Sequence, residues 1–385
     1  MKKKVCIVTN FNNTGNYGAV LQAYALNKRI NDFGLLCETL CFNIREQNGS
    51  KSNRYLKRLK RFEIKGIIED LVRDAEKLAV TRKIKYRKTA LKNFKDKIPH
   101  TKEYLYDELV QLPFEYDFFI CGSDQVWRPT FQGELVEIYW LKQIKGENVT
   151  KASYSASIGL ESLPERLWEE ASSYLRDFDF ISVREEQAKA FLTKICNKNI
   201  IVTLDPVFLL NKSEWKSKCS NPQIKEEYIF VYMIHGSKEL LYSIKKFAQK
   251  MNLKIVVFPY MAYKFRFAEC KFGDYRIFNA SPEDFLGFVD NAKYVFTDSF
   301  HVTAFSIIFQ KDFYSSVANA AAVSRIQNLF EKCGISERMI PAQGLNTDEY
   351  LSLKMPDWKE VEKSLENEIK ESVKYLKDVL QINTQ

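Results

Sequence analysis

The sequence has no run of apolar residues long enough to cross a membrane and no core of a secretory signal. A spanning helix needs about 20 consecutive apolar residues, and no stretch of the chain comes near that length. Lysines follow Met1, but the apolar run behind them, 5–9, is only about five residues, too short for the core of a signal peptide. We therefore expect a cytoplasmic protein that begins with a buried strand.

Paired cysteines and histidines are also scarce. The eight cysteines include no Cys-x-x-Cys pair and the chain has three histidines, so neither a zinc site nor a disulfide framework is indicated. We expect reduced, buried thiols and no metal. With 14 glycines and 10 prolines the chain is neither collagen-like nor of low complexity. Its 385 residues favour two domains of ordinary size.

The positive charge of the chain is concentrated in one segment. The formal net charge is +9, but residues 51–97 hold 17 basic and 6 acidic side chains, so the other 338 residues together carry −2. The segment has apolar residues at helical spacing and matches no nucleic-acid-binding module, so we expect no nucleic-acid partner. It is either a solvated helical face or a dock for an anionic membrane surface or a diphosphate-linked ligand. The docking alternative places the protein peripherally at the inner face of a membrane.

Short apolar runs alternate with helical stretches in two series. In the first series we expect strands at 5–9, 118–121, 152–156, 180–183 and 200–204, with helices at 17–30, 54–96 and 185–196. In the second we expect strands at 228–234, 253–258, 294–297 and 313–317, with helices at 238–250, 282–291 and 302–309. Strands separated by helices indicate parallel sheets covered on both faces.

The two series predict an α/β protein with two doubly wound, Rossmann-like domains that face each other across a cleft. The expected domains are residues 1–212, with 51–97 as a basic helical insertion, and residues 226–350. Residues 356–382 carry an apolar stripe and predict a last helix that packs back across the domain junction.

Polar residues lie where the first expected strand gives way to a helix. Asn16, Tyr17 and Gln22 follow an asparagine-rich loop at this point. The amino terminus of a helix favours an anion, although the loop is neither a Gly-x-Gly-x-x-Gly motif nor a P-loop. These residues either line a ligand or form a capped turn with Asn16 as the N-cap.

Two further strands end in polar side chains. Asp124 and Gln125 follow strand 118–121, where Asp124 is a candidate general base or binds ligand hydroxyls with Gln125, and the alternative is a loop cap. Arg184 follows strand 180–183. A guanidinium grips a carboxylate or phosphate with paired hydrogen bonds, and the alternative is a structural ion pair with Glu185.

Strand 294–297 delivers Asp298 and Ser299, followed by His301 at the start of a helix. Histidine exchanges protons near neutral pH, so His301 is predicted to be catalytic, with a structural histidine as the alternative. Arg325 and Arg338 lie further along the chain and are either phosphate ligands or surface cations.

In this order and spacing the motifs resemble those of the polysaccharide pyruvyl transferase family. The resemblance spans about residues 4–340 and rests on 16–22 (NYGAVLQ), 122–127 (GSDQVW), 151–159 (KASYSASIG), 182–186 (SVREE), 205–206 (DP), 297–301 (TDSFH), 305–309 (FSIIF) and Arg325. Relatives often have arginine where this chain has Ser299, so either Arg325, Arg338 or a lysine supplies the charge, or donor use differs in this branch of the family.

The resemblance implies a fold like that of the B-type glycosyltransferases and transfer of a pyruvyl group from phosphoenolpyruvate onto two sugar hydroxyls, in cell-surface polysaccharide synthesis. His301 would be the acid and Asp124 or Asp298 the base. The donor would bind on the side of the second domain, to Arg184, Ser299, Arg325 and Arg338. The acceptor would bind on the side of the first domain, to Asn16, Tyr17, Gln22 and Gln125.

The implied partners are phosphoenolpyruvate, as co-substrate and without a resident cofactor, and a nucleotide-linked, lipid-linked or polymeric sugar. Two other functions stay open. The same fold hosts glycosyltransferases that use a nucleotide-sugar donor, and it is compatible with a carbohydrate-binding protein that has no catalytic activity.

Overall fold

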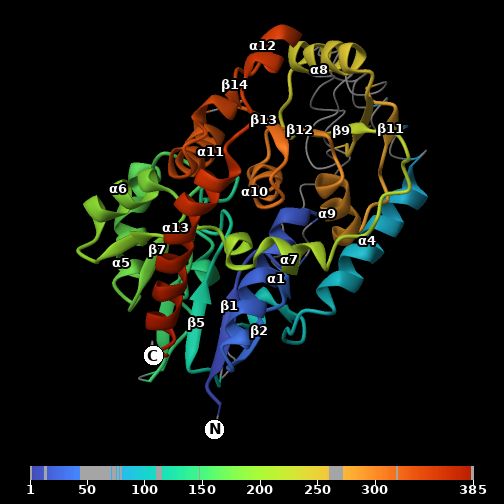
Figure 1. Cartoon of the computed structure of the whole chain (residues 1–385). Coiled ribbons are helices and arrows are strands. Elements are labelled where there is room, and N and C mark those ends of the chain that lie inside the picture. The colour runs from blue at the N-terminus through green and yellow to red at the C-terminus, as the bar shows by residue number, and fades with distance from the viewer. Residues whose placement is uncertain are drawn as a thin grey trace, which may run out of the picture.

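A computed structural model gives the structure of residues 2–12, 15–43, 71, 75, 78, 80–109, 115–146, 148–259, 272–317 and 320–382. Two parallel sheets, one in each half of the chain, form its framework and pack against helices (Figure 1). We call residues up to 212 the amino-terminal half and residues from 226 the carboxyl-terminal half.

The main sheet of the amino-terminal half has the strand order β2-β1-β5-β6, and its pairs are parallel. Its strands are β1 (Lys4–Val8), β2 (Leu36–Thr39), β5 (Phe118–Cys121) and β6 (Thr150–Ser153). The parallel pair β7 (Ile181–Val183) and β8 (Ile200–Val202) continues this sheet, because bridges join Ala152 to Phe180 and Ala156 to Val183. A second short parallel pair consists of β3 (Phe42–Asn43) and β4 (Tyr104–Leu105).

The sheet of the carboxyl-terminal half has the order β11-β10-β9-β12-β13-β14 and is parallel throughout. Its strands are β9 (Tyr228–Tyr232), β10 (Lys254–Val257), β11 (Tyr275–Arg276), β12 (Tyr294–Thr297), β13 (Asp312–Ser316) and β14 (Met339–Ile340). Parallel strands point their carboxyl ends to one edge, and this sheet therefore presents the residues after β9, β12 and β13 together.

Helices connect the strands of both halves. The amino-terminal half contains α1 (Tyr17–Asp32), α4 (Thr81–Lys95), α5 (Trp168–Leu175) and α6 (Glu186–Ile195), and α7 (Lys212–Lys216) begins the connection to the other half. The carboxyl-terminal half contains α8 (Lys238–Met251), α9 (Pro282–Asp290), α10 (Phe300–Ile308), α11 (Ala320–Cys333), α12 (Thr347–Ser352) and α13 (Trp358–Val379). Strand 152–156 was expected two residues too late, because β6 begins at Thr150 and leaves its ladder after Ser153.

The two halves share an apolar core beside α1. Val20 and Leu21 of α1 lie in the same cluster of buried side chains as Phe285 of α9 and Phe305 of α10. Tyr17, also in this cluster, donates a hydrogen bond from its hydroxyl to the Ala280 carbonyl at 2.8 Å. The first helix thus carries the junction between the halves.

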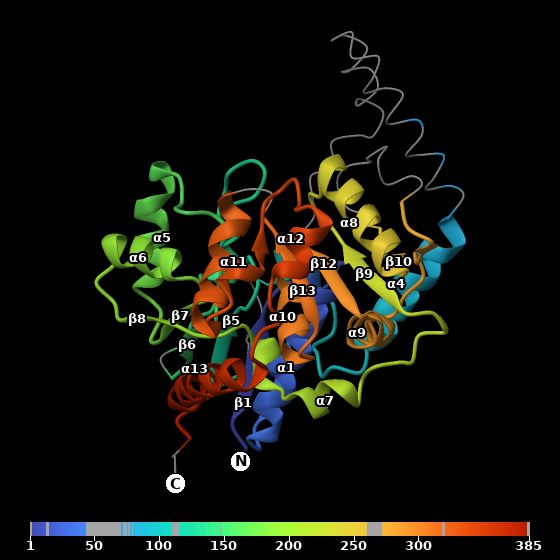
Figure 2. The same cartoon turned by 45° about the horizontal axis from the view of Figure 1, so that its top comes forward.

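The last helix, α13, contacts both halves (Figure 2). Val361 and Leu365, near its beginning, share the junction core with Leu329 of α11. Leu376 and Val379, near its end, belong to the core of the amino-terminal sheet. The helix therefore ties the two halves together along its length.

The described part of the basic segment is mainly α4. This helix has seven lysines and arginines and no acidic residue, and Lys83, Lys85 and Lys88 are exposed. Arg87 turns inward instead: it donates to the Gly15 carbonyl at 2.8 Å. Most of 51–79 lies outside the described residues, and with it most of the expected insertion. No helix in the described part of the chain is long and apolar enough to span a membrane.

Candidate active site

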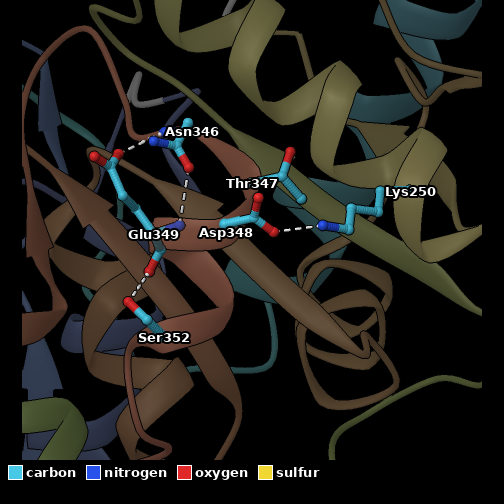
Figure 3. A pocket seen from close by; sticks show the side chains of 6 residues that line it. All are labelled: Lys250, Asn346, Thr347, Asp348, Glu349 and Ser352. Atoms are coloured by element: carbon cyan, nitrogen blue, oxygen red, sulfur yellow. Dashed lines mark hydrogen bonds and ion pairs between the residues drawn. The ribbon is translucent and has the colours of Figure 1, made fainter.

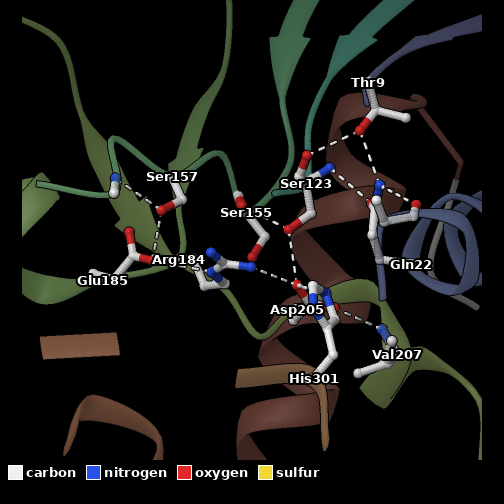
Figure 4. A network of polar contacts seen from close by, with 12 residues as sticks. Thr9, Gln22, Ser123, Ser155, Ser157, Arg184, Glu185, Asp205, Val207 and His301 are labelled. Atoms are coloured by element: carbon white, nitrogen blue, oxygen red, sulfur yellow. Dashed lines mark hydrogen bonds and ion pairs between the residues drawn. The ribbon is translucent and has the colours of Figure 1, made fainter. Parts of the chain in front are cut away.

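Charged side chains from both halves meet in one buried cluster (Figure 4). Arg184 follows β7, and Asp205 precedes the 3-10 helix Pro206–Leu209. His301 lies in the first turn of α10, which follows β12. The carboxyl ends of strands from two sheets bring these residues together, as open α/β sheets do at their binding sites.

Arg184 is almost fully buried, with 4% of its surface exposed. Its Nε donates to Glu185 at 3.0 Å and its Nη1 to Asp205 at 2.9 Å. Its guanidinium carbon lies 4.4 Å from the ring centre of Phe300 in α10. Burial acts to lower its pKa, but Glu185 and Asp205 outweigh this, so the pKa is raised and the cation is permanent. The remaining nitrogen, Nη2, is buried and has no hydrogen-bond partner.

His301 is buried to a similar degree and packs against α1. Its Nε2 lies 3.7 Å from Oδ2 of Asp205, beyond hydrogen-bond distance, and has no partner. Burial lowers the pKa of His301 below 6.5, whereas the carboxylates of Asp205 and Asp124 act to raise it. On the α1 side, a Cβ atom on Gly18 would come within 2.2 Å of the imidazole Nδ1, so only glycine leaves room for the ring.

Asp124 and Arg325 complete the charges around the histidine. Asp124 has a positive φ of 74° and is partly exposed. Burial acts to raise its pKa, but the charges of His301, Arg184 and Arg325 lower it on balance, so the carboxylate stays ionised. Burial, together with the nearby charge of Arg184, lowers the pKa of Arg325 to about 10, still well above neutrality.

A lattice of buried hydroxyls holds the loops that carry the cluster. Ser123 donates to the Ser155 carbonyl at 2.9 Å and to Asp205 at 3.0 Å. Ser182 exchanges hydrogen bonds with Ser153 in the same layer. Because buried hydroxyls need partners, this network fixes the strand ends in one arrangement.

Two residues predicted to bind the acceptor have structural roles instead. Tyr17 is 1% exposed, with its ring stacked on Phe285 and its hydroxyl bound to Ala280. Gln22 is fully buried: its amide donates to Thr9 at 2.9 Å and accepts from the Ser123 amide at 3.2 Å. The expectation for both is corrected, because Tyr17 bonds across the junction to Ala280 and Gln22 bonds to neighbours within the amino-terminal half.

Asn16 and Gln125 keep part of their surface exposed. Asn16 caps α1 by accepting a hydrogen bond from the Gly18 amide at 3.0 Å, as the capped-turn alternative predicted. Gln125 accepts from Arg128 at 3.1 Å and packs against Gly159. Their role in acceptor binding stays a prediction.

Asp298 has a structural role, and its role as a base stays a prediction. Its two carboxylate oxygens accept the amide hydrogens of Ile234 at 2.5 Å and His235 at 2.6 Å, which fixes the loop after β9. Ser299 is the N-cap position of α10, and its amide donates to Thr297 at 3.0 Å. Ser299 therefore lies beside His301, and its role in donor binding stays a prediction.

Arg338 does not join the cluster. It is fully buried and pairs with Asp312 at 2.7 Å. Asp312 begins β13, so this ion pair lies at the amino end of the sheet, opposite the edge that carries His301. The expectation that Arg338 binds the donor is corrected, and Arg325 is the arginine that takes part in the electrostatics of the site.

The residues that sequence reasoning left without a role are Asp205 and Gly18. Asp205 follows an expected strand and precedes a proline, which is a signal for a residue at a sheet edge. Gly18 gives no such signal, because its function is to leave space for a side chain from the other half of the chain.

A surface hollow lies away from this cluster (Figure 3). It is lined by Lys250, Asn346, Thr347, Asp348, Glu349 and Ser352, between α8 and α12. An ion pair between Lys250 and Asp348 crosses it, and none of the predicted site residues lines it. Within the described residues no three His, Cys, Asp or Glu side chains are placed to hold a metal ion, and whether the chemistry uses one stays a prediction.

Comparisons with known proteins identify the family and agree with this fold. The family model for polysaccharide pyruvyl transferase matches residues 16–319, which include Asp124, Arg184, Asp205 and His301. No curated protein matches the chain in sequence.

Two solved structures share the fold along its length. One is MnaA of S. aureus with UDP, at 13% identity and a TM-score of 0.53, covering 100% of this chain and 98% of that one. The other is a UDP-N-acetylglucosamine 2-epimerase, at 12% identity and a TM-score of 0.54, with the same two coverages of 100% and 98%. These similarities confirm the predicted class, two Rossmann-like domains arranged as in the B-type glycosyltransferases.

Proposed function

The chain belongs to the polysaccharide pyruvyl transferase family and is a transferase, and we propose that it moves the enolpyruvyl-derived group of phosphoenolpyruvate onto two hydroxyls of a sugar. The product would be a pyruvate ketal, with release of phosphate. The acceptor would be a nucleotide-linked, lipid-linked or polymeric sugar in cell-surface polysaccharide synthesis.

One observation supports an anionic donor above all. Two buried nitrogens, Nη2 of Arg184 and Nε2 of His301, come from opposite halves of the chain and have no hydrogen-bond partner. A buried donor left unpaired costs about 1–3 kcal/mol, more for a charged group. A ligand with carboxylate and phosphate oxygens would satisfy both nitrogens, and phosphoenolpyruvate carries both groups.

The proposed chemistry uses the charges of the cluster in sequence. His301, protonated, gives its proton to the methylene carbon of phosphoenolpyruvate, and the adjacent carbon becomes electrophilic. A sugar hydroxyl adds to that carbon and loses its proton to a base, for which we propose Asp124, whose charge acts on His301. The carbon–oxygen bond to phosphate then breaks, and the second hydroxyl takes its place.

The two substrates supply all the atoms and protons of the products. Of the two hydroxyl protons, one ends on the new methyl group and the other on the released phosphate. Arg184, with Arg325, would hold the carboxylate and phosphate of the donor, since a buried guanidinium keeps its charge. No redox change occurs, so we propose no resident cofactor.

Phosphate release from phosphoenolpyruvate in the presence of a panel of sugar acceptors tests this function. We expect phosphate and pyruvylated acceptor in equal amounts. A glycosyltransferase would instead release a nucleoside diphosphate from a nucleotide sugar and leave phosphoenolpyruvate intact, and that result would overturn the proposal.

We also propose that the exposed cations of α4 bind an anionic membrane surface. The helix bears seven positive charges and no negative one, and an exposed Tyr86 lies among them. Basic side chains near an acidic bilayer contribute about 1 kcal/mol each at moderate salt. Such binding would bring the enzyme to membrane-bound acceptors.

A further inference from the structure

We propose that Asp205 is a positioning residue of this site, whose single carboxylate fixes Arg184 and faces the imidazole of His301. The proposal rests on the proposed function, because it concerns the acid and the anion-binding arginine of that reaction. It adds a residue to which the sequence assigned no role.

One carboxylate oxygen of Asp205 lies close to both the guanidinium of Arg184 and the imidazole of His301. Oδ2 accepts hydrogen bonds from Nη1 of Arg184 at 2.9 Å and from Ser123 at 3.0 Å. The same oxygen is 3.7 Å from Nε2 of His301. The carboxylate oxygen that orients the arginine therefore also faces the histidine.

The carboxylate itself is held rigidly. Its side chain is completely buried, and the second oxygen, Oδ1, accepts the Val207 amide at 3.2 Å. Pro206 stands at the first position of the 3-10 helix that follows, which limits the backbone at this point. A charge that is buried this deeply is stable only because Arg184, Ser123 and Val207 all bind it.

The protonation of His301 is set by charges from four different elements. Asp205 and Asp124 favour the imidazolium, and Arg184 and Arg325 disfavour it. Burial lowers the pKa of His301, and the Asp205 carboxylate is the strongest influence in the opposite direction. Loss of this carboxylate would therefore lower the pKa of His301 further.

Asp205→Asn separates charge from shape, because asparagine keeps the size and a hydrogen-bond acceptor but loses the negative charge. We measure kcat/KM for phosphate release between about pH 5 and 8, the range in which histidine titrates. The falling limb of the profile is the decrease of kcat/KM as pH rises. In Asp205→Asn it should move to lower pH by about one to three units, as expected for the loss of a charge within roughly 4–6 Å. Because phosphoenolpyruvate also titrates here, variants are compared on the same substrate.

Two control variants isolate the effect. Ser123→Ala removes one hydrogen bond to the same carboxylate oxygen but leaves its charge, so the limb should stay in place. Asp312→Asn breaks the other buried arginine–aspartate pair, with Arg338, at the far end of the sheet. It should lower stability without moving the limb. A profile for Asp205→Asn that falls equally at all pH values would overturn the proposal.

A readout without substrate distinguishes this proposal from the proposed function. The imidazole C–H resonance of His301, assigned with His301→Gln, should titrate at lower pH in Asp205→Asn. If phosphoenolpyruvate is not a substrate but the resonance shifts, the proposed function fails and the role of Asp205 stands. If the enzyme is active and neither limb nor resonance moves, the role of Asp205 fails.

If Asp205→Asn does not fold, Asp205→Glu takes its place. The longer side chain keeps the charge but displaces the carboxylate from Arg184. We expect the KM for phosphoenolpyruvate to rise about 10-fold, as for a weakened bond to a charged group, with the limb near its original position. An unchanged KM would overturn the positioning role.

Discussion

Gly18 and His301 are in direct contact across the junction of the two halves. A Cβ atom at Gly18 would lie 2.2 Å from the imidazole Nδ1, far closer than any contact between non-bonded atoms. Helix α1 of the amino-terminal half therefore forms part of the surface against which His301 of the carboxyl-terminal half packs. The position of the proposed acid depends on how the halves meet, and not only on α10.

Gly18→Ala should displace His301 and impair catalysis. Inserting a methyl group into a packed site costs about 1–3 kcal/mol, and a misplaced catalytic group costs up to roughly 100-fold in rate. We expect kcat/KM for phosphate release to fall at least about 10-fold. Gly15→Ala is the matched control, because no atom lies within 4 Å of a Cβ there. Equal losses in the two variants would contradict this account.

Arg184→Lys should weaken donor binding. Lysine keeps the positive charge, but it cannot keep both Glu185 and Asp205 and still offer a further nitrogen to the substrate. We expect the KM for phosphoenolpyruvate to rise about 10- to 100-fold, the value of one or two hydrogen bonds to a charged group.

Arg338→Lys is the control for that substitution, because Arg338 is equally buried and pairs with Asp312 away from the site. It should lower the melting temperature and leave KM unchanged. If both variants raise KM alike, the effect is one of general destabilisation.

The pH dependence should follow the protonation of His301. Burial lowers its pKa below 6.5, and the proposed acid must be protonated, so kcat/KM should fall as pH rises through that lowered value. A bound anion favours the imidazolium, and the falling limb of kcat should therefore lie at higher pH than that of kcat/KM. Steady-state rates across pH test this order, and the reverse order would contradict a protonated histidine in the complex.

Charge reversal on α4 should abolish membrane binding but not catalysis. Lys83→Glu, Lys85→Glu and Lys88→Glu together should weaken binding to acidic vesicles at least about 100-fold, at roughly 1 kcal/mol per charge. Activity on a soluble acceptor should persist. The control reverses three exposed lysines of α13, Lys359, Lys363 and Lys374. Vesicle binding that survives reversal on α4 would rule out this helix as the dock.

The sequence predicts the regular elements of this fold well. Long apolar runs identify β5, β9 and β12, because buried parallel strands are apolar on both faces. The two-residue strands β3, β4, β11 and β14 were not expected, since so short a pairing depends on its neighbours and leaves no pattern. The amino-terminal boundary of β6 was missed because Thr150 and Lys151 are only half-buried.

The site was predictable only in part. Arg184, Asp124 and His301 stand directly after strands, and parallel strands bring such residues to one edge. The sequence could not separate them from Asp298, which follows β12 in the same way, or from Arg338, whose ion-pair partner it does not indicate. Their partners, Asp312 and the amides after β9, are decided by packing between distant segments.

The central claim is that Arg184 and His301 together bind and activate phosphoenolpyruvate. The most direct measurement is acceptor-dependent phosphate release by the unmodified enzyme and by His301→Gln, with the mass of the acceptor followed in parallel. The account predicts equal amounts of phosphate and pyruvylated acceptor for the unmodified enzyme and almost none for the variant. Undiminished release by His301→Gln would contradict it.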